Sequence, residues 1–86
     1  MGRCKYEKLQ AIEPALDEIR KIEVLKETKP GIFYLKSQGF LHFHEKEDKI
    51  WADLKVGDKW EPIDIPLKVT KKILKYFVKT VTDAIA

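Results

Sequence analysis

The chain has few of the residues that build covalent or phosphate-binding sites. Cys4 is the single cysteine, so neither an intramolecular disulfide nor a cysteine-based zinc site can form. There is no glycine-rich phosphate loop, dinucleotide fingerprint or metalloprotease helix. The serine and the threonines fall in predicted turns and helices without a nucleophile motif. We therefore predict a protein that is not an enzyme and has no cofactor.

Long apolar runs are also missing. No stretch approaches the roughly 20 residues of a membrane-spanning helix, and the N-terminus lacks a signal-peptide core. We expect a cytoplasmic protein with no membrane partner. Its 86 residues form one domain, 1–86, in which residues 1–4 are expected to be frayed.

Charge and composition give two further hints. The 17 Lys and Arg against 14 Asp and Glu leave a net charge of +3, which permits nucleic-acid binding without arguing for it. Asparagine is absent and the charge is carried mainly by Lys and Glu, a habit of hyperthermophile proteins. The composition therefore suggests a thermophilic source.

The N-terminal part is helical by pattern, from Lys5 to about Lys21. Apolar residues recur there at spacings of three and four. Because proline is best tolerated in the first turn of a helix, Pro14 predicts a short lead-in, a break and a main helix starting near Glu13. A single helix kinked at Pro14 is the alternative.

Short alternating segments fill the middle of the chain. A first strand is predicted to start at 22–24 and a second to span 32–36, with turns at 29–31 and 37–39. Gly39 is expected to supply a positive φ in the second turn. Pro62 cannot donate a hydrogen bond to a neighbouring strand, which places the last strand, 60–65, at a sheet edge.

The segments 40–45 and 50–56 alternate with period two and predict the central hairpin. If Glu45 pairs with Ile50, one face receives the core residues. The other face, hereafter the second face, receives His42 opposite Asp53 and His44 opposite Trp51. Continuing the pairing from Val56 and Lys59 adds Trp60 and Asp64 to the second face, with the same parity. For the strand 32–36 a slip of one residue decides whether Tyr34 lies there.

The C-terminal segment is a clear amphipathic helix. Its apolar row runs at i, i+4, and its other side carries a stripe of five lysines, Lys68, Lys71, Lys72, Lys75 and Lys79. The stripe could attract a nucleic-acid backbone or be an ordinary solvated face. The fold class is therefore α+β: an N-terminal helix, a four- to five-stranded antiparallel meander and a C-terminal helix packed on one sheet face.

A metal site is one interpretation of His42-x-His44. Two imidazoles on the same side of a strand can share an ion, and Asp53 across the hairpin could add a carboxylate. The alternative is an ordinary cross-strand pair of His42 with Asp53, with His44 stacked on Trp51.

Aromatic residues dominate our functional prediction. We expect the second face to form a binding surface, whose residues are Phe40, His42, His44, Trp51, Asp53 and Trp60. Such a patch typically marks a partner surface, although a helix or the N-terminal segment could instead cover it. The leading hypothesis is a non-enzymatic binding or assembly module, in its simplest form a homodimer.

The residues 30–34, 40–45 and 52–53 (PGIFY, FLHFHE and AD) also carry a resemblance. This part of the chain is similar to a small family of uncharacterised prokaryotic proteins. The resemblance implies no activity, cofactor or site residue.

Overall fold

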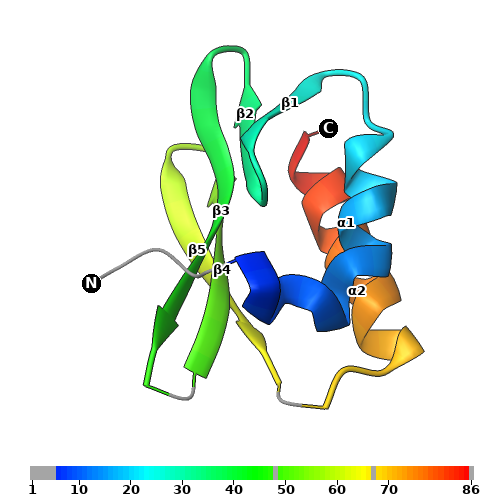
Figure 1. Ribbon diagram of the computed structural model, residues 1–86. Helices are drawn as coiled ribbons and strands as arrows, with labels where there is room; N and C mark the ends of the chain where they lie inside the picture. Colours follow the sequence, from blue (N-terminus) through cyan, green and yellow to red (C-terminus); the bar gives the residue numbers. More distant parts are fainter. Residues whose placement is uncertain (1–5, 48, 67, 86) are drawn as a thin grey trace.

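The computed structural model describes residues 6–47, 49–66 and 68–85, so Cys4 and the predicted fraying of residues 1–4 lie outside the described part. An N-terminal helical segment is followed by five strands and a final helix (Figure 1). The elements in order are the 3-10 helix η1 (Tyr6–Ile12), α1 (Glu13–Arg20), β1 (Leu25–Lys29), β2 (Ile32–Leu35), β3 (Gln38–Lys46), β4 (Lys49–Val56), β5 (Lys59–Ile65) and α2 (Lys71–Ile85). The predicted α+β class is confirmed.

The N-terminal break lies where the proline predicts it. A tighter 3-10 segment ends at Ile12, and α1 begins at Glu13 with Pro14 in its first turn. Proline costs nothing there, since the first backbone N–H groups of a helix have no intrahelical partner. The larger aliphatic side chains of this stretch from Leu9 onward are buried in the core, with Leu16 and Ile19 fully enclosed.

The five strands form one antiparallel sheet in the order β1-β2-β3-β4-β5. The predicted registers are confirmed: Glu45 pairs with Ile50, His42 with Asp53, and Val56 with Lys59. Lys46 also pairs with Lys49, which shortens the β3–β4 connection to residues 47 and 48; Asp48 lies outside the described residues. The strand containing Pro62 is an edge strand, as predicted.

Two connections between elements differ from the prediction. The strand β1 starts at Leu25, because Ile22 still continues the end of α1: its N–H donates to the Ile19 carbonyl at 3.0 Å. In the β2–β3 turn, Lys36 and Ser37 have positive φ and Gly39 does not, so the conformational role predicted for Gly39 is wrong. A two-residue turn with both φ values positive matches the right-handed twist of the strands, and this geometry outweighs the residue preference.

Phe40 does not lie on the second face. It is 3 % exposed and belongs to the helix-side core, so its predicted place in the binding surface is wrong. The cause is a bulge: Phe33 pairs with Leu41 while Tyr34 pairs with Gly39, which leaves Phe40 as an extra residue in β3. A bulge breaks the alternation, and Phe40 and Leu41 are therefore both buried. Phe33 is buried as well, which leaves Tyr34 for the second face.

Both helices pack against one face of the sheet, as Figure 1 shows. The core between them includes Phe33, Leu41 and Leu54 from the sheet and Val81 from α2, each almost completely buried. The side chain of Thr70 caps the N-terminus of α2: its hydroxyl oxygen accepts a hydrogen bond from the Ile73 N–H at 3.3 Å. Among the described residues, neither helix has the length and apolar character needed to cross a membrane.

Arg20 links α1 to β1. Its Nε and Nη2 donate to the two carboxylate oxygens of Glu27, at 2.8 and 3.0 Å, and its Nη1 contacts Glu13 and Asp17. Glu27 also accepts a hydrogen bond from the backbone N–H of Gly31 at 2.9 Å. The hydrogen bond from Arg20, helped by the one from Gly31, lowers the pKa of Glu27 despite its partial burial.

Candidate functional site

The second face is the side of the sheet turned away from both helices (Figure 1). Strands β3, β4 and β5 present its central side chains, and no described helix lies over them. Because these strands form a continuous ladder, the side chains stand on a rigid base. The central residues are His42, His44, Trp51, Asp53, Lys55 and Trp60.

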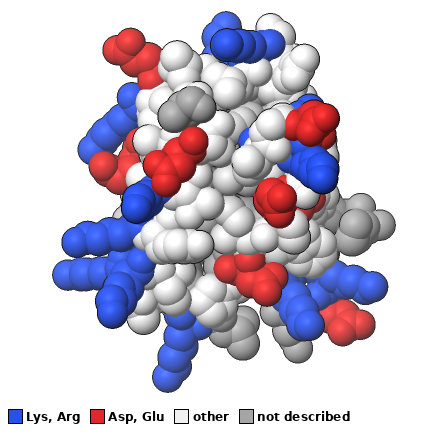
Figure 2. Space-filling model, turned by 180° about the vertical axis from the view of Figure 1, so that it is seen from behind, with Lys and Arg blue, Asp and Glu red and all other residues white. Residues whose placement is uncertain are grey.

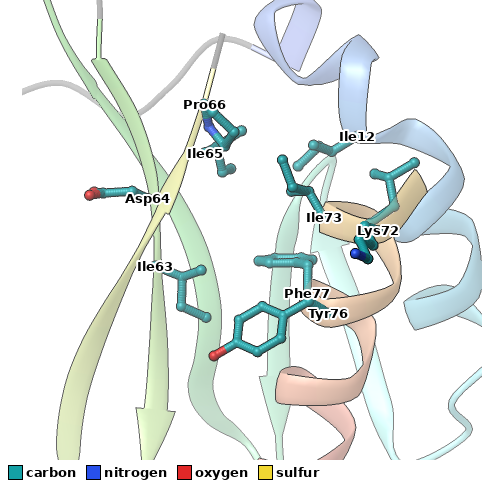
Figure 3. A pocket seen from close by; sticks show the side chains of 10 residues that line it. Ile12, Ile63, Asp64, Ile65, Pro66, Lys72, Ile73, Tyr76 and Phe77 are labelled. Atoms are coloured by element: carbon teal, nitrogen blue, oxygen red, sulfur yellow. The ribbon is translucent and has the colours of Figure 1, made fainter. Parts of the chain in front are cut away.

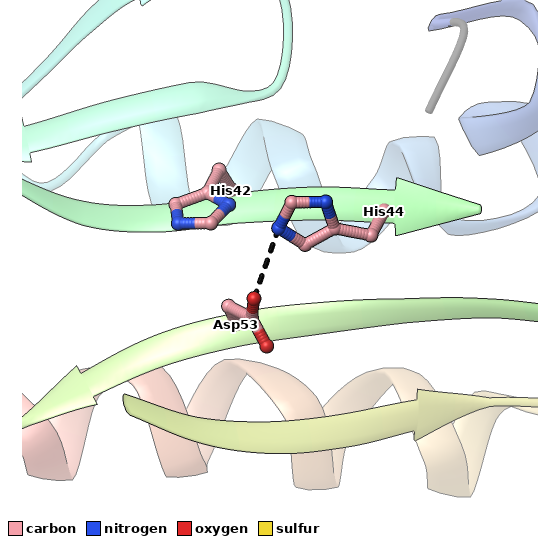
Figure 4. A group of neighbouring side chains, drawn as sticks. All are labelled: His42, His44 and Asp53. Atoms are coloured by element: carbon pink, nitrogen blue, oxygen red, sulfur yellow. Dashed lines mark ion pairs between the residues drawn. The ribbon is translucent and has the colours of Figure 1, made fainter. Parts of the chain in front are cut away.

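The side chain of Asp53 forms an ion pair with His44, the diagonal neighbour of its backbone partner His42. The two side chains meet with Nε2 of His44 2.9 Å from Oδ2 of Asp53, as Figure 4 shows. The predicted cross-strand register of His42 with Asp53 is confirmed, and the ion pair of Asp53 with His44 is an additional contact that was not predicted. The long imidazole side chain reaches the diagonal neighbour, a contact that antiparallel strands allow.

The histidines are enclosed by aromatic rings. His44 lies against Trp51, with 5.6 Å between ring centroids and planes 30° apart, which confirms the predicted stacking. The rings of His42 and His44 meet edge to face at 4.7 Å. As a result the side chains of His44 and Asp53 are only 17 % and 22 % exposed.

Trp60 crosses the second face above β4. Its ring lies 4.7 Å from that of His42, and the Lys55 Nζ stands 5.6 Å from the indole centroid. A Cβ on Gly39 would lie 3.7 Å from the far edge of this ring, so the indole passes over the bare backbone of β3. The sequence analysis missed this contribution of Gly39. Trp60 itself remains 43 % exposed.

Three potential metal ligands converge at the centre of the second face. His42, His44 and Asp53 each offer one ligand atom, and these atoms lie within 4.8 Å of one another. Nδ1 of His44 is buried and has no hydrogen-bond partner in the described part of the chain. The structure therefore brings together the three residues that the sequence grouped as possible ligands.

The lysines of the C-terminal segment lie on the opposite side of the molecule. Figure 2 shows basic side chains projecting together from the side where α2 lies. All five are exposed, and four of them border two different grooves: Lys72 borders the groove between α2 and β5, whereas Lys71, Lys75 and Lys79 border the groove beside α1. Nucleic-acid binding by these lysines stays a prediction.

An apolar groove between α2 and β5 was missed by the sequence analysis. It has a volume of about 500 Å³ and is lined mainly by isoleucines and aromatic rings, among them Ile63, Ile73 and Phe77 (Figure 3). Tyr76 borders it and is 67 % exposed, while Asp64 points away from it. The sequence pattern assigns these apolar residues to the core, and only the distance between the helix and the sheet edge reveals that they are incompletely covered.

Comparison with known proteins gives no further information about this site. The resemblance to an uncharacterised prokaryotic family stays a prediction. No protein-family model, no curated protein and no solved structure matches the chain.

Proposed function

We propose that this protein is a non-enzymatic binding and assembly module that self-associates through its second face. One observation carries the proposal: Trp60 is 43 % exposed on a sheet face that no described helix covers, and its ring is in contact with the ring of His42. A large aromatic side chain that is both rigid and exposed is typical of an interface anchor.

The composition of the face supports binding more than covalent chemistry. Apart from Pro62, the described side chains of β3, β4 and β5 on this face are aromatic, imidazole, acidic or basic, and none is a hydroxyl or thiol nucleophile. Half-buried Trp51 and His44 extend the apolar area around Trp60. A partner that covered these rings would remove apolar surface from water.

The charges on the face favour a second copy of the chain as that partner. Lys46 and Lys55 stand on the same face as Asp53 and Asp64. In a two-fold symmetric dimer each patch meets itself, so a patch needs both signs of charge to be self-complementary. A patch of a single sign would repel its own copy.

The oligomeric state tests this proposal. We expect sedimentation velocity over a range of concentrations to show a monomer–dimer equilibrium. Removal of an interface hot spot costs about 2 kcal/mol or more, so Trp60→Ala should weaken the dimer roughly 30-fold or more. Tyr76→Ala, which removes a more exposed aromatic ring from the helix side, serves as the matched control and should leave the equilibrium unchanged.

Two results would contradict the proposal. One is a wild-type protein that stays monomeric at the highest concentration reached. The other is a dimer that Tyr76→Ala disrupts and Trp60→Ala does not, because the contact would then lie on the helix side.

A further inference from the structure

We infer that His42, His44 and Asp53 bind one divalent transition-metal ion per chain, with Zn²⁺ as the foremost candidate. The inference rests on the proposed function, since it names a ligand for the same binding face. It depends, however, on three side chains inside one chain and not on the contact between two copies.

The spacing of the three ligand atoms is close to what a zinc ion needs. Zinc binds imidazole nitrogen and carboxylate oxygen at about 2.0–2.2 Å, which places two ligands of a tetrahedron roughly 3.3–3.6 Å apart. Nε2 of His44 and Oδ2 of Asp53 are 2.9 Å apart, and the ligand atoms of the three residues lie within 4.8 Å of one another. Side-chain rotations that move an atom by about 1 Å are enough to close the site around an ion.

The type of donor selects the class of metal. Imidazole suits Zn²⁺, Cu²⁺, Ni²⁺ and Fe²⁺, whereas Ca²⁺ and Mg²⁺ prefer all-oxygen sites. Two imidazoles and one carboxylate therefore favour a transition metal over the alkaline-earth ions. Three protein ligands also leave a fourth position for water or another ligand.

The surroundings hold the ligands in place. His42 and His44 stand two residues apart on β3, and Asp53 stands on the adjacent β4, so the backbone ladder fixes all three origins. Trp60 lies against His42 and Trp51 against His44, which restricts both imidazoles. Nε2 of His44 is the ring nitrogen that faces Asp53 and is therefore the ligand atom of this residue, whereas the other ring nitrogen, Nδ1, is buried and makes no hydrogen bond with the described residues.

Metal titration of the full-length chain tests the inference. The protein must carry no histidine tag, because His42 and His44 are the only two histidines of the chain. Calorimetry with Zn²⁺ should give about one ion per chain, Co²⁺ should give the visible absorption of a four-coordinate site, and Ca²⁺ and Mg²⁺ should not bind.

Matched variants assign the ligands. Loss of a residue that only supports a metal ligand commonly weakens affinity 10- to 100-fold, so His44→Gln and Asp53→Asn should each weaken Zn²⁺ binding by at least about that factor. Asp64→Asn removes a carboxylate from the same face outside the cluster and should not change affinity. Cys4→Ser, which removes the only thiol, should also bind Zn²⁺ normally. Circular dichroism should confirm that each variant is folded.

The inference is overturned if the wild-type protein binds no Zn²⁺, or if His44→Gln binds it as tightly as the wild type. A stoichiometry of one ion per two chains would also overturn it, because the ion would then be shared between copies. Two measurements on the wild-type protein separate this inference from the proposed function: sedimentation velocity reports self-association, and calorimetry reports Zn²⁺ binding. A dimer without metal affinity contradicts only the metal site, and a metal-binding monomer contradicts only the assembly module.

Discussion

The indole of Trp60 lies on the imidazole of His42, at 4.7 Å between centroids and 59° between planes, although the two residues belong to strands that are not neighbours. Trp60 is on β5 and His42 on β3, so the ring bridges β4. The contact between the two rings therefore spans β3, β4 and β5 on the second face, to which neither helix contributes. Trp60 remains 43 % exposed in this contact.

The two tryptophans should report this difference. In Trp51→Phe the remaining Trp60 is 43 % exposed, whereas in Trp60→Phe the remaining Trp51 is half-buried against His44. At concentrations where the protein is monomeric, acrylamide should therefore quench the fluorescence of Trp51→Phe more strongly than that of Trp60→Phe. Equal quenching, or the reverse order, would contradict the described arrangement.

Two glycines should respond oppositely to alanine. Gly31 has φ +80°, and a Cβ there would lie 3.0 Å from Cδ1 of Leu9, so Gly31→Ala should destabilise the fold by about 1–2 kcal/mol. Gly39 lacks a positive φ, and its Cβ would make an ordinary 3.7 Å contact with Trp60. Gly39→Ala should therefore be neutral or stabilise by about 0.4–1 kcal/mol, through loss of unfolded-state entropy. Urea unfolding of both variants measures the difference, and a destabilised Gly39→Ala would disprove this role of the position.

Phe40 should behave as a core residue. It is nearly fully buried, so Phe40→Ala should lower the free energy of unfolding by about 3–5 kcal/mol. Tyr76→Ala, at an aromatic position that is 67 % exposed, should change it by roughly 0.5 kcal/mol or less. Denaturant unfolding distinguishes the two. A small effect of Phe40→Ala would indicate that the side chain lies on the surface, as simple alternation along β3 predicts.

The pKa of Glu27 gives the stability a defined dependence on pH. The hydrogen bond from Arg20 holds the pKa of this carboxyl below 4.5, its ordinary value, in the folded protein. A lowered folded-state pKa means that the stabilisation is complete above pH 4.5 and is lost as the pH falls through the folded-state value. We expect Glu27→Gln to lose about 1 kcal/mol near neutral pH, since the ion pair is only partly buried.

The measurement is the free energy of unfolding as a function of pH for both proteins. The difference between wild type and Glu27→Gln should shrink as the solution is acidified below pH 4.5. Glu18→Gln, which alters an exposed pair with Lys21, is the control and should change stability little. A difference that stays constant down to strongly acidic pH would show that the Arg20 contact does not stabilise the ionised carboxyl.

The sequence was sufficient for the sheet because its register is specified twice. The pairs that start from Glu45–Ile50 and from Val56–Lys59 independently assign the same parity to β4. A slip of one residue would expose the apolar set, so the burial pattern itself fixes the register. Pro14 likewise located the start of α1.

The remaining features depend on geometry that residue types do not encode. The bulge at Phe40 lies close to the tight turn at Lys36 and Ser37, whose positive φ values neither residue type favours. The pairing of Asp53 with His44 depends on side-chain reach across a diagonal. The backbone register was therefore enough to group His42, His44 and Asp53 from the sequence, whereas the contacts between their side chains could not be predicted.

The strand order has a consequence for how copies of this chain can meet. On one edge, β1 is charged and exposed beyond Leu25, and its pairing with β2 is irregular between Glu27 and Lys29. On the other edge, Pro62 removes one backbone donor from β5. Charge, irregular pairing and proline are the devices by which natural sheets avoid adding strands from other molecules. Both edges of the sheet thus carry features that oppose edge-to-edge growth of the sheet into fibrils.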